Sequence, residues 1–390
     1  MKNTQAAEAI QINGMFTFIY FSLGAMYPLL SHYLQSIGMN GTHIGLIVSV
    51  GPIIAIVAEP FWGMMCDRFR IPRQILMGIL AMTAVMSVII LDGKTFLSFA
   101  LLYAVLHFFQ SGVVPISDGM ALRYAAREGI DFGRVRQWGA IGFALATLIV
   151  GLLAQKYSFL VIFYVYGLAQ LIALLFLYRM DVAQAGEKVN IWKGLLHLIR
   201  IPRYILFLPS AFLIFGPINA HNVYFGLLYD KLGGNIAGIG LAFLLFAGSE
   251  APFMKFSGFF IRRLGLERTI LLAGLISSVR WFWYGTSPTP AAVLALFFVQ
   301  GLSVGLYLAS ATQFVKENTP DSLRVTAIAI YTSMGLGLGS MASNLIGGMI
   351  LDKWGIFATY KFFGLLTAVG LIPLFYVYII GRKQQGTVLL

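Results

Sequence analysis

Charged residues are scarce in this 390-residue chain, at 11% of the sequence, and cysteine is represented by Cys66 alone. An average soluble domain carries about 25% charged residues. A single thiol excludes an internal disulfide framework and a multi-cysteine metal site. The sequence also lacks a glycine-rich nucleotide loop, histidines at metal spacing and a nucleophile elbow. A membrane-bound enzyme is therefore a poor alternative, and we expect no cofactor and no bound metal.

Apolar residues make up 59% of the chain and gather in segments long enough to cross a lipid bilayer. We expect twelve such segments, near residues 12–35, 42–66, 73–92, 95–125, 136–155, 157–179, 203–229, 236–261, 268–287, 290–315, 322–351 and 357–380. The fold class predicted is an all-α membrane protein with twelve transmembrane helices. The longest polar interval lies at the midpoint, so we expect an N-terminal six-helix bundle at 1–180, a cytoplasmic linker at 181–202 and a C-terminal six-helix bundle at 203–390.

Basic residues give the chain a net charge of +12 and predict its orientation. Of the 27 lysines and arginines, 20 fall in segments that face the cytoplasm if both termini are cytoplasmic. Such a bias is typical of the positive-inside rule. The charge therefore indicates a cell inner (plasma) membrane, with the lipid bilayer as partner and no nucleic acid.

An internal repeat supports two related halves. A glycine followed four residues later by a polar pair closes the second, fifth, eighth and eleventh segments. The copies are Gly63 with Asp67-Arg68, Gly151 with Gln155-Lys156, Gly258 with Arg262-Arg263, and Gly348 with Asp352-Lys353. Gly63 and Gly258 are 195 residues apart, and Gly151 and Gly348 are 197 apart. Three-helix modules of alternating orientation, repeated in each half, are typical of transporters.

At these residues the chain resembles the major facilitator superfamily of transporters. Gly63–Arg73, with the sequence GMMCDRFRIPR, is similar to the signature loop between helices 2 and 3 of that superfamily. Arg70 stands where this loop usually has a glycine, and Arg73 is slightly displaced. The resemblance implies two six-helix bundles that transport a solute by alternating access. It also implies a cytoplasmic latch, for which the gating candidates are Asp67, Arg68, Arg70, Arg73 and Arg136.

A narrower resemblance is to the phenylpropionate permease branch, near the oligosaccharide–proton symporters. It rests on Gly133–Phe143 in helix 5, Ala220–Phe225 in helix 7, Glu250 in helix 8 and Arg280-Trp281 in helix 9. Members of that branch often have a histidine early in helix 10, whereas this chain has Gln300. The resemblance implies acid and base groups for proton coupling in the C-terminal bundle, but no role for a helix-10 histidine.

Charges inside apolar segments are the candidates for proton coupling, since each costs about 2.5–3.5 kcal/mol at a helix centre. Glu250 and Arg280 are both expected near mid-membrane as an ion pair, with Glu250 as the coupling acid. The alternative is a static pair that fixes helices 8 and 9 in register. Asp118 and Arg136 are expected to pair as an inner gate, a solute site or a loop-stabilising salt bridge. Glu59 completes the proton-coupling candidates.

Polar and aromatic residues on helices 1, 4, 7 and 10 are the solute-binding candidates, because superfamily geometry implicates these four helices. Polar side chains supply orientation in such sites and aromatic faces supply contact area. The candidates are His221, Asn222, Tyr224, Asn219, Gln300, Tyr20 and Gln110.

The function expected is secondary active transport of a small-molecule solute. Proton-coupled uptake of an aromatic acid, sugar or nucleoside is preferred, by a protein that works as a monomer. Sodium coupling stays open, as does the alternative of proton-coupled drug or metabolite efflux. Helix 5 reads Gly139-Ala140-Ile141-Gly142 without the proline usual in efflux members, which weakens that alternative.

Overall fold

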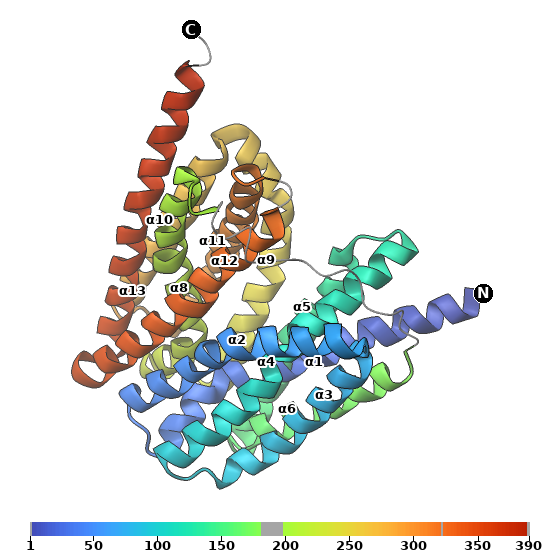
Figure 1. Cartoon of the computed structure of the whole chain (residues 1–390). Coiled ribbons are helices and arrows are strands. Elements are labelled where there is room, and N and C mark those ends of the chain that lie inside the picture. The colour runs from blue at the N-terminus through green and yellow to red at the C-terminus, as the bar shows by residue number, and fades with distance from the viewer. Residues whose placement is uncertain (1, 181–197, 321–322, 388–390) are drawn as a thin grey trace. The chain divides into compact units, whose positions relative to one another are not determined.

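The computed structural model describes residues 2–180, 198–320 and 323–387, and the regular elements in these ranges are helices (Figure 1). The elements of the first part are α1 (Lys2–Ser36), α2 (Gly41–Phe69), α3 (Pro72–Ile89), η1 (Ile90–Asp92), α4 (Phe96–Glu128), α5 (Phe132–Lys156) and α6 (Val161–Tyr178). Those of the second part are α8 (Pro202–Lys231), α9 (Ile236–Leu264), α10 (Leu266–Tyr284), α11 (Pro290–Glu317), α12 (Arg324–Thr332), η3 (Ser333–Gly339) and α13 (Ser340–Thr387).

Local sequence signals explain where α4 and α5 begin and end. Thr95 and Ser98 form a reciprocal capping box at the start of α4, and Gly129 ends that helix at a φ of 66°. Asp131 then caps α5 by accepting a hydrogen bond of 2.6 Å from the backbone nitrogen of Gly133. These residues satisfy backbone groups that a helix terminus leaves without a partner.

The chain divides into two compact units. Unit 1 comprises Met1–Met39, Val50–Lys188 and Gly234–Ala247, and unit 2 comprises Asn40–Ser49, Val189–Gly233 and Gly248–Leu390. These bounds differ from a simple division at the midpoint, because the first turns of α2 belong to unit 2 and the first part of α9 belongs to unit 1. Most of the linker expected at 181–202 lies outside the described residues.

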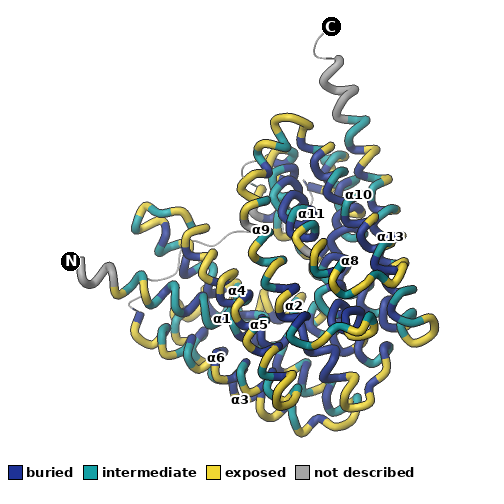
Figure 2. The backbone as a smooth tube through the Cα atoms, turned by 180° about the vertical axis from the view of Figure 1, so that it is seen from behind, coloured by how far each residue is buried: buried dark blue, intermediate teal, exposed yellow. Residues whose placement is uncertain are grey.

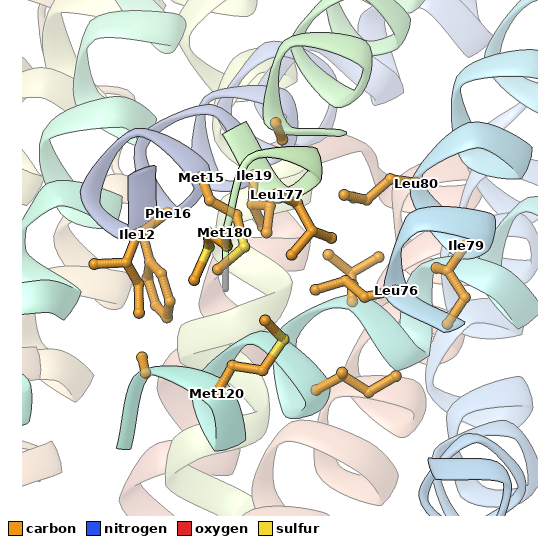
Figure 3. Packing of buried hydrophobic residues seen from close by; sticks show 14 of the residues in the cluster. Ile12, Met15, Phe16, Ile19, Leu76, Ile79, Leu80, Met120, Leu177 and Met180 are labelled. Atoms are coloured by element: carbon orange, nitrogen blue, oxygen red, sulfur yellow. The ribbon is translucent and has the colours of Figure 1, made fainter. Parts of the chain in front are cut away.

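Unit 1 is built around α1, which packs along α5 and α6, while α3 packs between α4 and α6. Figure 3 shows part of its apolar core, where side chains of α1, α3, α4 and α6 meet. Ile12, Met15, Phe16 and Leu76 are fully buried there. The cluster positions the inward faces of α1 and α4, which carry the candidate site of this unit.

Unit 2 is organised by α13, which packs along α8 and α10. α13 changes direction at Gly355, whose φ of 78° is outside the helical range. As expected from the sequence, two helices occupy this part of the chain and meet at Gly355: α12, η3 and the first part of α13 correspond to 322–351, and the rest of α13 to 357–380. Asp352 and Lys353 continue the first of these helices, and the break comes at Gly355, in a conformation that glycine adopts readily.

Exposed positions recur along several helices, among them α3 and α6 (Figure 2), and many of these positions hold large apolar residues. Examples are Val85 and Val88 on α3, and Leu168 and Leu175 on α6. Among the described residues, nine helices are long and apolar enough to cross a membrane, or ten if the two parts of α9, which meet at 44°, form one span. Exposed apolar faces of this length are typical of helices that contact lipid.

Candidate functional site

A charged pair and an aromatic ring form the candidate site of unit 1. Arg136 on α5 donates from Nη1 to Oδ2 of Asp118 on α4 at 2.7 Å, as the sequence predicts. The guanidinium also lies over the ring of Tyr20 on α1, 5.4 Å from its centroid. Arg136 is about half exposed (46%) and Asp118 a quarter exposed (25%), so the pair can reach a solute. The other carboxylate oxygen, Oδ1, is buried and has no hydrogen-bond partner among the residues that the structure describes.

Gln110 belongs to a buried polar network rather than to this accessible pair. Its Oε1 accepts hydrogen bonds from the hydroxyl of Tyr166 and from Nε2 of Gln170 at 3.2 Å. Gln170 donates further to Ser22 at 3.1 Å, which links α1, α4 and α6. The acceptor atom of Gln110 is thus occupied by the protein, and we withdraw this residue from the solute-binding set. Hydrogen bonds of this kind between helices hold the helices in position.

The guanidinium of Arg280 is the most unusual group of unit 2. Only 4% of the residue is exposed, yet Nε, Nη1 and Nη2 have no hydrogen-bond partner within the described parts of the chain. Aromatic rings take their place: the guanidinium carbon lies 4.2 Å from the ring centroid of Trp281 and 5.9 Å from that of Tyr284. Desolvated cation–π contacts contribute about 2 kcal/mol each.

The ion pair expected between Glu250 and Arg280 is not formed in the described residues, because no guanidinium nitrogen of Arg280 has a hydrogen-bond partner. Glu250 instead lies at the 44° break between the two parts of α9. Its backbone packs against glycines of α11, where a Cβ added at Gly305 would lie 2.9 Å from the Glu250 carbonyl oxygen. The sequence placed both charges at similar depth but gave no information on the direction of either side chain.

His221 on α8 completes an aromatic cluster around Arg280. Its Nδ1 lies 2.8 Å from the hydroxyl of Tyr360 on α13, and its ring lies 4.7 Å from that of Trp281. His221 is fully buried and Gln300 on α11 is 1% exposed, so both side chains face the interior of unit 2. The structure therefore keeps these two solute-binding candidates in one polar centre.

Three neighbours of His221 on α8 have different environments. Asn222 is partly exposed, and its Oδ1 has no hydrogen-bond partner in the described ranges. Asn219 donates to the Phe215 carbonyl of its own helix at 3.0 Å. Tyr224 is fully buried and donates to the Asn344 carbonyl on α13 at 2.6 Å. Because that hydroxyl fastens α8 to α13, we withdraw Tyr224 from the solute-binding set.

The expected latch of Asp67 with neighbouring arginines is not formed. None of the ion pairs among the described residues includes Asp67, which is exposed. Arg68 lies over the ring of Phe69, and Arg70 adopts a positive φ of 55°. Arg73 donates to the carbonyl of Tyr178 at the end of α6. A role of these residues in gating stays a prediction.

Glu59 lines a cavity of about 310 Å³ between α2 and α4, together with Asp67 and Arg123. Trp62 closes one side and donates to the Phe108 carbonyl at 2.6 Å. The glutamate is exposed, so water can hydrate its carboxylate. It lies apart from the Asp118 pair, since Asp118 is not part of the cavity lining.

Two copies of the sequence repeat make matching contacts. In unit 1, Gln155 accepts a hydrogen bond of 3.0 Å from the backbone nitrogen of Ala237 at the start of α9. In unit 2, Asp352 accepts hydrogen bonds from the backbone nitrogens of Gly41 and Thr42 at the start of α2, the second at 2.7 Å. The polar residue that ends one helix thus caps another helix. The sequence repeat gave the positions, but not these partners.

Sequence reasoning missed Tyr284 and Tyr360 of the aromatic cluster. Tyr284 lies four residues after Arg280 on α10, a spacing that places both on one helix face and could have indicated it. Tyr360 comes from α13, 139 residues from His221, and no local pattern connects the two.

Comparisons with known proteins agree with this architecture. The model of the MFS_1 like family, part of the major facilitator superfamily, matches residues 9–362. The maltose permease of Geobacillus stearothermophilus is 41% identical over 358 residues, which cover 91% of each chain. The probable 3-phenylpropionic acid transporter of Escherichia coli (strain K12) is 24% identical and covers 88% of this chain and 90% of its own.

Among solved structures, the nucleoside transporter NupG superposes with a TM-score of 0.83 at 16% identity and covers 96% of this chain and 99% of its own. That likeness shows the fold. With the exposed apolar helices, the family match establishes a multi-pass membrane protein. The chain is a secondary transporter of small solutes that belongs to the MFS_1 like family.

Proposed function

We propose that this transporter takes up a neutral oligosaccharide of the maltose type by proton symport. The observation that carries the proposal is the accessible Asp118–Arg136 pair beside the ring of Tyr20. The 41% identity to a maltose permease over 91% of both chains supports the same solute class.

The chemistry of this pair suits a sugar. Hydroxyl groups of the sugar can accept hydrogen bonds from the guanidinium nitrogens of Arg136 that do not bond Asp118. Charged hydrogen-bond partners in a planar arrangement give both strength and orientation. The ring of Tyr20 adds an apolar surface for the sugar ring.

We propose Glu250 as the proton-coupling acid. Its position at the 44° break of α9, against glycines of α11, allows the carboxylate to change environment when the helix bends. Protonation and solute binding would each favour one orientation of the transporter, and coupling requires a difference in affinity between the two. The pairing with Arg280 expected from the sequence would then belong to another step of the cycle.

We also propose twelve spans, with both termini in the cytoplasm. The stretch 326–380 comprises 55 residues, which as a continuous helix would measure about 80 Å at 1.5 Å per residue, more than twice the thickness of the hydrocarbon core. The break at Gly355 supports two spans there. α10 has 19 residues, a length that can cross the hydrocarbon core. The charge of Arg280 lowers the mean hydropathy of this helix but does not prevent it from crossing the membrane.

Uptake of radiolabelled maltose into proteoliposomes with an imposed pH gradient tests the function. We expect accumulation when the outside is acidic, and a KM at least tenfold higher for Arg136→Lys, which keeps the charge but loses the planar fork. Maltose that neither binds nor accumulates would refute the solute class.

Glu250→Gln tests the coupling. We expect it to abolish accumulation while preserving exchange of labelled for unlabelled maltose, because a neutral side chain no longer releases its proton. Glu317→Gln, at the end of α11, is the matched control and is expected to accumulate maltose normally. Normal accumulation by Glu250→Gln would remove Glu250 from the mechanism.

A further inference from the structure

A π-helical segment interrupts the helix that runs from α12 into α13. It spans the seven residues Ser333–Gly339, and the backbone nitrogen of Ser340 donates to the carbonyl of Gly335, five residues earlier. A π turn holds an additional residue compared with an α turn, and such turns occur frequently at functional sites. The segment therefore sets the rotation of the part of α13 that precedes the break at Gly355.

The segment is firmly packed against α8. A Cβ added at Gly335 would lie 2.5 Å from the Phe215 ring, and one added at Gly339 would lie 2.5 Å from the Phe212 carbonyl oxygen. Gly216 approaches Gly339 equally closely. The π turn is thus held by contacts that only glycine permits.

A row of contacts follows directly after the segment. Asn344, Gly348 and Asp352 are spaced by four residues and therefore share one face of α13. Tyr224 donates to the Asn344 carbonyl, Gly348 packs against the backbone of Gly41, and Asp352 caps the start of α2. All three contacts depend on the rotation of this face.

We propose that Ser333–Gly339 is a register switch that releases α2 and α8 from α13. If the π turn becomes α-helical without losing a residue, Ser340–Asp352 turns by about 100° relative to α12, since an α-helix has 3.6 residues per turn. Asn344, Gly348 and Asp352 then leave their partners together. The switch works in the same way whichever solute is transported.

Thiol labelling without solute tests the proposal in proteoliposomes. Ser49 on α2 is 1% exposed and donates to the Met341 carbonyl of α13 at 3.2 Å, so Ser49→Cys in a Cys66→Ser background reacts only when this contact opens. Leu336 is an exposed residue of the segment (44%), and its deletion removes the additional residue of the π turn. The segment can then be α-helical while Asn344, Gly348 and Asp352 keep the orientation that they have in this structure. We expect labelling at least tenfold slower in this variant than in the parent.

Gly337→Ala tests the opposite direction. A Cβ added at Gly337 has no atom within 4 Å in the described chain, so the substitution favours the α-helical form without a clash. We expect labelling at least threefold faster. Equal rates in all three proteins would overturn the switch. If the deletion variant does not elute as a folded monodisperse protein, an unchanged or slower rate for Gly337→Ala overturns it.

Discussion

Arg280 shows how a single residue can be costly to the fold and still be retained. Bringing a guanidinium out of water costs several kcal/mol, and in the described residues no carboxylate bonds to this one. The contacts with Trp281 and Tyr284 offset part of that cost. A buried charge with so incomplete a set of partners leads us to predict a role for Arg280 in transport.

Arg280→Met separates the two contributions. Methionine has a similar length and no charge, so the melting temperature in detergent is expected to stay unchanged or rise, because the desolvation cost disappears. Maltose accumulation is expected to fall at least tenfold, since the aromatic cluster loses the charge that it surrounds. Differential scanning calorimetry and proteoliposome uptake measure the two effects.

Arg280→Lys is the companion variant, which keeps the charge and should retain part of the activity. A marked fall in melting temperature for Arg280→Met, with uptake preserved, would instead assign Arg280 to stability.

Residue roles were predictable only where the partner was close in sequence. Asp118 and Arg136 are joined by a short connection between α4 and α5, so their pairing followed from the sequence. The environment of Arg280 comes from α8 and α13 as well as its own helix. Complementary charge alone favoured a pair with Glu250, which the described residues do not form in this structure. Tyr224 and Gln110 were predicted to bind solute because the sequence shows only that a polar side chain lies in an apolar segment. It does not show whether that side chain contacts a solute or forms a hydrogen bond within the protein.

At the scale of elements, two helices begin with a cap supplied by another helix. Both carboxylate oxygens of Asp352 accept hydrogen bonds from backbone nitrogens at the start of α2. One amide oxygen of Gln155 accepts a hydrogen bond from a backbone nitrogen at the start of α9. A carboxylate at a helix N-terminus also interacts favourably with the helix dipole. The cap of α2 should therefore be the stronger of the two.

Asp352→Ala and Gln155→Ala measure this difference. We expect a loss of about 1–2 kcal/mol of stability for Asp352→Ala and a smaller loss for Gln155→Ala, in line with N-cap substitutions. Thermal denaturation in one detergent gives both values. Lys353→Ala, next to Asp352 and exposed, is the control and should change little. A larger loss for Gln155→Ala would contradict the ranking.

Helix positions were predictable because hydropathy and turn residues coincide. The segment expected at 73–92 is α3 with η1, which ends at Asp92. The break expected between 351 and 357 is present at Gly355. That Asp352 and Lys353 still belong to the helix before it was not predictable, because the contacts of Asp352 come from α2. The π segment was also missed, since Gly335, Gly337 and Gly339 are equally compatible with close packing in an α-helix.

At the scale of the whole molecule, each unit contains a piece of the other half of the sequence. Unit 2 includes Asn40–Ser49, and unit 1 includes Gly234–Ala247. The polar interval at the midpoint does not indicate this exchange, because hydropathy marks where a helix crosses lipid and not which helices it packs against.

Separate expression of residues 1–188 and 189–390 tests this exchange. Each fragment lacks one segment that its unit needs, so we expect either fragment alone to be degraded or aggregated. Co-expression should restore a folded complex and measurable maltose uptake, because the missing segments are then supplied. Fluorescence-detected size exclusion and uptake are the measurements. A fragment that is stable by itself would show that the exchanged segments are dispensable.

The buried guanidinium of Arg280 also has a consequence for selectivity. At an effective dielectric constant of 20, a second positive charge about 7 Å away is disfavoured by about 2.4 kcal/mol. That corresponds to an affinity roughly 50-fold lower, at tenfold per 1.4 kcal/mol. Lipophilic amines and other cationic compounds would be repelled from the interior of unit 2. An uncharged sugar has no net charge to be repelled.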